Sequence, residues 1–539
     1  MAQKRAAAER TGKQPKGERR PGERNSGATT HREIERKYEV MGEVRLPDLT
    51  RAHGVATAHA RGVTELDAVY YDTADLRLAA DSLTLRRRTG GGDAGWHLKI
   101  PVAPGVRDEI RAPLSDTLPR SLAGLLRSRV RTTPVQPVVR LRSRRDVTHL
   151  HAADGTLLAE VSVDTVHAER LTGCPGSADW TEIEVELADD VDPEILEAVE
   201  KRLVKAGIQP SAAPSKLARA LAATGTPVPE RPTTEGTGPD ADTDTGTAGS
   251  VVLAYVREQV DALIRLDPAV RRDQPDAIHR MRVACRRLRS ALRTYGNVLD
   301  REVTDPLAAE LRRLAGELGA ARDLEVLDDR IGTALAAIPR ELAAGPVHRR
   351  LKSWAKSGGA GTRRRAQAAL DSPRHLALLT RIDALLADPP LLPAAHRAAG
   401  PVLRKAVLRD HRRLARRVER ALALDPGTER DHALHDARKA AKRVRYAAEA
   451  AAPALGKPAR RLVTRMKRLQ DCLGDHQDSV VARAALRELA DAAHTAGETA
   501  FTWGVLYGRE EAVAADRERE LPRVWARSFA PRFRAARSR

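Results

Sequence analysis

The sequence predicts an α+β protein in which a domain built on an antiparallel β-sheet precedes an all-helical domain. Two observations carry this prediction. Residues 31–223 contain segments in which apolar and polar side chains alternate, and residues 251–539 show helical periodicity nearly throughout. A third observation separates the domains: residues 224–250 include eight Thr, five Gly and four Pro, with Val228 as the only large aliphatic residue. Such a segment cannot be buried, which predicts a flexible linker.

Charge is distributed unevenly along the 539 residues. The 93 Lys and Arg exceed the 73 Asp and Glu, giving a net charge of +20. Residues 251–539 hold 57 basic and 36 acidic side chains, so residues 1–250 hold the remaining 36 and 37 and are nearly neutral. The surplus predicts an anionic partner for the helical domain. We expect a cytoplasmic protein without a membrane partner, because no apolar run reaches the ~18 residues that span a bilayer and three scattered cysteines favour a reducing compartment.

The elements of the first domain follow from this alternation. Residues 1–30 are polar and basic and are predicted to form a disordered arm. Within residues 31–223, the alternating segments predict strands at 33–38, 83–88, 96–100, 139–142, 159–164 and 182–187. Turns rich in Gly, Pro and Asp separate them. We therefore expect an antiparallel sheet large enough to close into a barrel.

The polar positions of these strands carry nearly one sign of charge each. Glu33 and Glu35 share one face about 7 Å apart, and Lys37 continues that face. A second acidic strand holds Glu182, Glu184 and Glu186. Carboxylate oxygens suit Mg²⁺ or Mn²⁺. Guanidinium and ammonium groups suit a polyanion, and they occur at Arg86, Arg88, Lys99, Arg107, Arg111, Arg140 and Arg142.

Metal-binding carboxylates that face rows of Arg and Lys across a closed barrel predict a phosphoryl-transfer site. Some neighbouring residues are not expected to belong to it. Arg36 and Arg87 fall on the opposite faces of their strands, and His97 is expected to point outward.

The segment Glu33-Ile34-Glu35-Arg36-Lys37 resembles the ExExK signature of the CYTH family, also called triphosphate tunnel metalloenzymes. Further motifs follow in that family's order at residues 70–73, 85–88, 96–99, 140–142, 164, 182–187 and 215–217. The resemblance implies an eight-stranded antiparallel tunnel that binds a triphosphate and divalent cations. It implies metal ligands at Glu33, Glu35 and two of Glu182, Glu184 and Glu186, and which two stays open.

The same resemblance implies the other site residues of the tunnel. Asp164 would assist a metal ion or its water and, with Glu33, Glu35 and Lys37, would be catalytic. The implied phosphate ligands are Lys37, Arg86, Arg88, Lys99, Arg140, Arg142 and Lys216.

The helical domain contains an internal repeat with an offset of 156 residues, because the segment 277–289 matches 433–445. A second match, of 311–323 with 466–478, has an offset of 155. The segments 277–289 and 433–445 each carry a stripe of basic residues on one helix face. Like charges four residues apart are unfavourable in an isolated helix, so the repeated stripe predicts an anionic ligand. Its residues are His279, Arg282, Arg286 and Arg289 in one copy, and His435, Arg438, Lys442, Arg443 and Arg445 in the other.

These repeats resemble the CHAD family, in which an HxxR segment with further basic residues precedes a Leu-Gly-x-x-x-Asp segment, in duplicate. The resemblance implies an all-α duplicated helical bundle whose basic surface binds inorganic polyphosphate through the two stripes. The leading hypothesis is thus metal-dependent hydrolysis of inorganic triphosphate, or of a related triphosphate, beside a polyphosphate-binding module.

Other functions remain open at this point. The alternative is a non-catalytic polyphosphate-binding protein associated with polyphosphate granules. Adenylate cyclase or thiamine-triphosphatase activity also stays possible, because tunnel enzymes share the metal and phosphate groups. Nucleic-acid binding ranks last, because aromatic residues make up only 3% of the chain and no base-stacking motif is visible.

Overall fold

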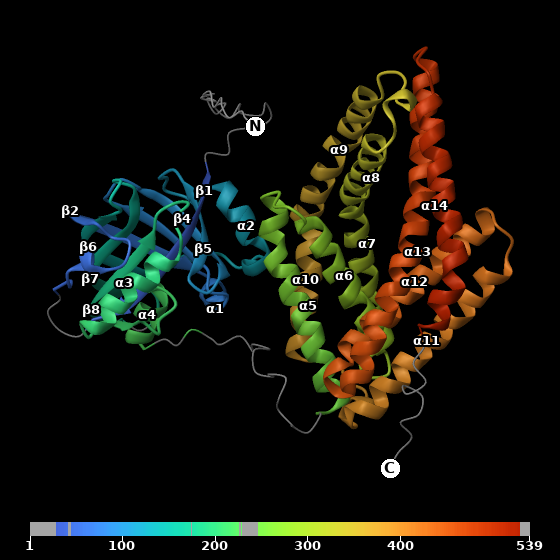
Figure 1. The fold of residues 1–539 in the computed structure, drawn as a ribbon. Helices are drawn as coiled ribbons and strands as arrows, with labels where there is room; N and C mark the ends of the chain where they lie inside the picture. Colours follow the sequence, from blue (N-terminus) through green and yellow to red (C-terminus); the bar gives the residue numbers. More distant parts are fainter. Residues whose placement is uncertain (1–27, 41–44, 174, 226–227, 229–245, 529–539) are drawn as a thin grey trace, which may run out of the picture. The chain divides into compact units, whose positions relative to one another are not determined.

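The computed structural model describes residues 28–40, 45–173, 175–225, 228 and 246–528 (Figure 1). The chain divides into two compact units, residues 1–123 with 134–230 and residues 124–133 with 231–539. Most of the expected N-terminal arm and linker lies outside the described residues. No helix in the described part of the chain is long and apolar enough to cross a membrane.

The first unit is a closed antiparallel β-barrel, which confirms the predicted sheet. The strands pair in the order β5-β4-β3-β2-β6-β7-β8-β1, and β1 also pairs with β5 to close the circle. The two-residue strand β9 (Gln209–Pro210) adds to β1. The eight barrel strands are β1 (Thr29–Glu39), β2 (Thr57–Asp72), β3 (Thr84–Thr89), β4 (Gly95–Ala103), β5 (Val106–Ala112), β6 (Gln136–His151), β7 (Leu157–Arg170) and β8 (Ser177–Leu187).

Strand β1 closes the barrel because it changes partner half-way along its length. Residues 29–34 pair with β5, and residues 35–39 pair with β8. Glu33 therefore lies opposite Arg107 on one neighbour, while Glu35 lies opposite Glu186 on the other. The acidic segment predicted from the sequence is thus at the seam of the barrel.

Helices cover both faces of the barrel wall. Between residues 45 and 225 the helical elements are η1 (Leu49–Arg51), α1 (Arg77–Ala80), α2 (Arg120–Val130), α3 (Glu194–Lys205) and α4 (Lys216–Ala223), of which α3 and α4 pack on the barrel wall. On the outer face, α3 joins a buried cluster with Tyr38, Val161 and Ile183. On the inner face, α4 packs Leu217 against a second apolar cluster that contains Leu141. This packing fixes the start of α4 inside the barrel wall.

Asp72 at the end of β2 organises the turn that leads into α1. Its side chain is fully buried and accepts hydrogen bonds from the backbone N–H groups of Thr73 (2.7 Å), Leu78 (2.9 Å) and Ala79 (2.8 Å). Burial raises the pKa of Asp72, although the three N–H donors act in the opposite direction. The role of this residue is structural.

The second unit is all-helical, as predicted. Its helices include long antiparallel pairs, α8 with α9 and α13 with α14 (Figure 1). Their bounds are α5 (Ala248–Arg271), α6 (Ala277–Thr294), α7 (Arg301–Glu317), α8 (Gly319–Ala336), η2 (Arg340–Leu342), α9 (Val347–Asp371), α10 (Pro373–Ala387), η3 (Pro393–His396), α11 (Ala399–Ala423), α12 (Thr428–Ala450), α13 (Ala452–Thr495) and α14 (Phe501–Ala526).

The order of these helices reproduces the internal repeat. Helix α6 corresponds to α12, α7 and α8 together correspond to α13, and α9 corresponds to α14. The first copy is broken at Leu318, whereas α13 runs for 44 residues with one non-helical residue, Gly456, near its start. Residues of both copies, such as Leu288 and Val444, belong to one continuous hydrophobic core.

We predict that Asp72→Ala lowers the free energy of unfolding by about 2 kcal/mol, because three buried N–H donors lose their acceptor. Chemical denaturation followed by circular dichroism measures this change. Asp75→Ala is the control, since Asp75 lies on the same turn but is exposed and pairs with the partly exposed Arg77. Its change should stay within about 0.5 kcal/mol. Equal effects of the two substitutions would contradict the structural role of Asp72.

Candidate functional site

The interior of the barrel holds a cavity of about 500 Å³ lined mainly by charged side chains. Both signs of charge reach into it from different strands. The acidic lining residues are Glu33, Glu35, Asp93, Glu109, Glu160, Glu184, Glu186 and Asp189, and the basic ones are Lys37, Arg86, Arg88, Lys99, Arg107, Arg111, Arg145 and Lys216.

Of the three carboxylates at the seam of the barrel, Glu33, Glu35 and Glu186, the first and the last are only partly neutralised by cations of the chain. Glu33 Oε1 accepts a hydrogen bond from Lys99 Nζ at 2.5 Å, but Glu33 Oε2 is buried and has no hydrogen-bond partner among the described residues. Burial and the charges of Glu33 and Glu35 raise the pKa of Glu186 to about 7. A hard cation between these oxygens would relieve the repulsion.

Lys37 holds the other side of this acidic group. Its ammonium donates to Glu35 Oε2 at 2.9 Å and also contacts Glu184. Burial alone would raise the pKa of Glu35, but Lys37 and Lys99 lower it to about 2. Glu35 is therefore ionised at neutral pH and available as an oxygen ligand.

A second acidic group, Asp164, Glu182 and Glu184, already contains a cation supplied by the chain. The oxygens of the three carboxylates lie within 4.8 Å of one another. The Lys216 ammonium lies 3.0 Å from Asp164, 2.6 Å from Glu182 and 2.6 Å from Glu184. Arg145 adds contacts of 2.7 Å to Asp164 and 2.8 Å to Glu184. This arrangement fits an internal ion-pair network better than a metal site.

The three Glu residues of β8 therefore have different surroundings. Glu184 and Glu186 line the cavity, and Glu182 does not. Glu182 is bound to Lys216 and accepts a hydrogen bond from Trp180 Nε1 at 2.7 Å. Of these three carboxylates, Glu186 is the least neutralised by cations of the chain and is therefore the best candidate metal ligand.

The opposite wall of the cavity is basic. Burial and the neighbouring charges of Arg86 and Arg145 lower the pKa of Arg88 to about 9. Burial would also lower the pKa of Arg86, but Tyr70 and Glu109 raise it overall. Cations that repel one another in a buried wall are stabilised by a bound anion.

The structure corrects the expected positions of Arg140 and Arg142. Both lie on the outer face of β6, where Arg140 pairs with Asp67 and Arg142 lies 3.9 Å from Glu169. Neither residue lines the cavity. The inner face of β6 carries the residues of opposite parity, which are apolar near α4, so the prediction that these two arginines face the tunnel was wrong.

Sequence reasoning missed Arg145, Glu109 and His97. Arg145 is the inward-facing arginine of β6, and its odd number sets it apart from Arg140 and Arg142. His97 does not point outward as expected. It shares strand parity with Lys99, is almost fully buried, and its Nδ1 lies 2.9 Å from Glu109 Oε1.

Burial lowers the pKa of His97 to about 4, so this side chain is neutral at physiological pH. Glu109 also contacts Arg86 at 3.6 Å and Lys99 at 3.9 Å, which orients two lining cations. The alternation of Glu109 with Arg107 and Arg111 was a signal available in the sequence.

In the helical unit, the structure brings parts of the two predicted stripes together. Helices α6 and α12 contact each other, and burial, Arg438 and Arg286 lower the pKa of Lys442 to about 7. Burial also lowers the pKa of Arg286, and Arg282 and Arg438 contribute. Each repeat supplies one acidic partner for its stripe: Arg282 lies 2.9 Å from Asp323, and Arg438 lies 3.6 Å from Asp478.

The remaining stripe residues lie in other surroundings. Arg443 donates to Asp410 at 2.9 Å beside a second cavity of about 370 Å³. Burial and repulsion from Arg293 and other cations lower the pKa of Arg289. Arg445 lies 3.3 Å from Glu449. His279 and His435 occupy corresponding positions on α6 and α12, and burial lowers the pKa of His435.

Comparison with known proteins identifies two domains. A CYTH domain matches residues 31–221, and a CHAD domain matches residues 254–487. Two uncharacterised proteins of Mycobacterium tuberculosis, from strains CDC 1551 / Oshkosh and H37Rv, are each 39% identical to this chain over 526 residues. The match covers 94% of this chain and 98% of each relative.

Two solved structures are each similar to part of this chain. The CHAD domain from the plant Ricinus communis is 27% identical, with a TM-score of 0.43 and coverage of 55% of this chain and 94% of that one. A putative adenylyl cyclase from Hippeastrum, described as having a dominant triphosphatase activity, is 18% identical, with a TM-score of 0.22 and coverage of 37% and 100%. On the domain matches and the full-length relatives, this chain belongs to the family of proteins in which a CYTH domain is followed by a CHAD domain.

Proposed function

We propose that the barrel hydrolyses inorganic triphosphate or a related triphosphate with Mg²⁺ or Mn²⁺. The observation that carries this proposal is that one cavity has two different walls. At the acidic seam the carboxylates are incompletely neutralised, and on the basic wall the arginines repel one another. Phosphate oxygens would pair with the cations of the wall, and a divalent cation held by the seam carboxylates would neutralise their charge. Membership of the CYTH family supports the same assignment.

Glu33, Glu35 and Glu186 would hold the cation, and Glu184 would complete the oxygen set. The unpartnered Glu33 Oε2 and the raised pKa of Glu186 support this assignment. Glu182 is excluded because, unlike Glu184, it does not line the cavity. A bound divalent cation supplies charge neutralisation at phosphoryl oxygens and an activated water.

The residues of the chain bind and orient the phosphate groups. Arg86, Arg88 and Lys99 present forked or point charges from the wall, and Lys37 connects the wall to the acidic seam. Asp164 acts as a positioning residue through Lys216 and Arg145 rather than as a direct ligand. The phosphate-binding set we propose is Lys37, Arg86, Arg88, Lys99, Arg107, Arg111, Arg145 and Lys216.

Substrates of this class differ in what lies beyond the triphosphate. A panel of tripolyphosphate, longer polyphosphates, ATP and thiamine triphosphate, each with Mg²⁺ and with Mn²⁺, distinguishes triphosphatase from cyclase and thiamine-triphosphatase activity. Binding of tripolyphosphate without phosphate release under all conditions would favour the non-catalytic alternative.

For the helical unit, we propose binding of long-chain inorganic polyphosphate along α6 and α12. The convergence of Arg282, Arg286, Arg438 and Lys442 supports this, because these cations have too few acidic partners in the described residues. A flexible polyanion neutralises such a row, and its affinity falls steeply with salt. In the described part of the chain, the two free and buried cysteines, Cys285 and Cys472, fit the reducing cytoplasmic compartment that we propose.

We predict that Glu33→Gln combined with Glu35→Gln lowers phosphate release from tripolyphosphate about 100-fold or more, because the cation loses two charged ligands. A colorimetric phosphate assay with Mg²⁺ or Mn²⁺ measures this loss. Glu169→Gln is the matched control, since Glu169 is an exposed carboxylate on β7 outside the cavity. Full activity of the double variant would refute the mechanism.

The corrected positions of the arginines generate a second prediction. Arg86→Ala should lower kcat/KM about 30-fold or more, equivalent to about 2 kcal/mol, because a buried cation facing the substrate is lost. Arg140→Ala should leave kcat/KM unchanged, because its guanidinium lies on the outer face. Steady-state kinetics with tripolyphosphate compare the two variants. Equal losses would show that the outer arginine also reaches the substrate.

A third prediction concerns the pH dependence of polyphosphate binding. The pKa of Lys442 is about 7 in the free protein, and a bound polyanion raises it. Binding above pH 7 should therefore take up a proton, and affinity should fall as pH rises from 7 to 9. Calorimetric titration in buffers of different ionisation enthalpy measures both effects.

Lys442→Arg is the control for this prediction, because arginine stays protonated over the whole range. The variant should lose the part of the proton uptake that Lys442 contributes and should bind with a flatter pH profile. Identical profiles for the variant and the wild-type protein would contradict the assignment.

A further inference from the structure

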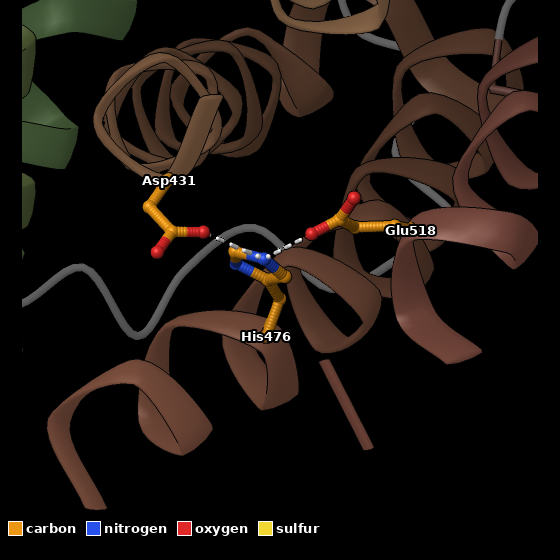
Figure 2. Close-up of side chains that lie close together, drawn as sticks. All are labelled: Asp431, His476 and Glu518. Carbon is orange, nitrogen blue, oxygen red and sulfur yellow. Dashed lines mark hydrogen bonds and ion pairs between the residues drawn. The ribbon is translucent and has the colours of Figure 1, made fainter. Parts of the chain in front are cut away.

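A cluster outside both proposed sites joins three helices of the second repeat. Asp431 comes from α12, His476 from α13 and Glu518 from α14, and their side chains point toward one another (Figure 2). His476 Nε2 lies 3.1 Å from Glu518 Oε1 and 3.3 Å from Asp431 Oδ1. Only 2% of the His476 side chain is exposed. One nitrogen and two anionic oxygens thus converge within 4.8 Å of one another.

The carboxylates are held in place from behind. Arg430 Nε lies 3.1 Å from Glu518 Oε2, and Arg483 lies 3.4 Å from Asp431 Oδ2. Each carboxylate therefore gives one oxygen to a guanidinium and leaves the other directed at His476. Supporting contacts of this kind orient the ligands of metal sites.

A cation at the centre of the cluster would be attracted by both carboxylates and by the lone pair of the imidazole nitrogen. An imidazole nitrogen carries at most one proton, so Nε2 can donate to both carboxylates only through a shared, bent hydrogen bond. A metal ion placed among the three atoms contacts all of them directly. One imidazole with two carboxylates is a mixed nitrogen and oxygen set, which suits Zn²⁺ better than the Mg²⁺ favoured by oxygen-only sites.

The internal repeat shows that the fold does not require this trio. In the first copy, Pro275 occupies the position equivalent to Asp431 at an offset of 156 residues. Ala321 and Arg363 occupy the positions equivalent to His476 and Glu518 at an offset of 155 residues. That copy nevertheless forms the same succession of helices. The cluster is therefore an addition to one copy rather than part of the common helical framework.

We propose that Asp431, His476 and Glu518 bind one Zn²⁺ ion, with water as a fourth ligand. The ion links α12, α13 and α14 and is independent of the cation proposed for the barrel. Its role is structural, because it fixes three helices of the second repeat to one another. The proposal does not depend on the proposed activity.

The test measures metal binding to the full-length chain carrying Glu33→Gln and Glu35→Gln, so that the barrel contributes less to the count. Protein stripped with a chelator is titrated with Zn²⁺ against a chromophoric chelator. Adding His476→Gln should remove one equivalent of bound Zn²⁺. His494→Gln is the matched control, because His494 is exposed near the end of the same helix and its replacement should leave the count unchanged.

Two further measurements keep the proposal falsifiable if His476→Gln does not fold. Co²⁺ added to stripped protein should give visible absorption of a histidine-containing site, and Asp431→Asn or Glu518→Gln should abolish or shift it. Zn²⁺ should also raise the Tm of the stripped protein by binding the folded state. Equal Zn²⁺ counts with and without His476, or no Co²⁺ spectrum and no Tm shift, would overturn the proposal and leave His476 as a polar partner of the two carboxylates.

Discussion

The structure of the barrel depends on one constraint: ionised side chains removed from water must meet opposite charges. Lys216 shows how strict this is, because its buried ammonium contacts Asp164, Glu182 and Glu184 at 2.6 to 3.0 Å. Helix α4 carries Lys216 to this position by packing Leu217 and its neighbours against the inner apolar cluster. The charge network and the apolar packing are thus two parts of one arrangement.

Where the chain does not meet the constraint by itself, the molecule is prepared for a ligand. The barrel seam lacks positive charge to balance its carboxylates. Around Arg88, and along α6 and α12, negative charge is lacking to balance the cations. The difference between the two units is one of geometry. The barrel encloses both deficits in a limited cavity, which is the basis for proposing a short triphosphate substrate, whereas the helices present one deficit along a row, which is the basis for proposing a long polyphosphate ligand.

Much of this could be read from the sequence, because strand alternation and helical repeats are local patterns. The acidic strands that contain Glu33 and Glu186, and the helices that carry the duplicated stripes, lie at the residues predicted for them. Arg140 was misplaced for a different reason: alternation gives two faces, and only the barrel's packing against α4 and α3 decides which is inner. His97 shares strand parity with Lys99, so alternation alone places it on the inner face. The sequence around His476 hints at a metal ligand, but it does not reveal Asp431 and Glu518, since the three residues come from three helices with no shared spacing and no counterpart in the first copy.

The pairing of β1 with two partners has a consequence for how the chain reaches its fold during synthesis. Glu35 lies opposite Glu186, which follows it by 151 residues, so the first strand to leave the ribosome cannot be enclosed until the last barrel strand has been made. Contacts so distant in sequence form slowly, and an unpaired strand edge invites aggregation meanwhile. Charged side chains along β1 oppose such misassociation. The residues that create the acidic seam therefore also protect the nascent chain.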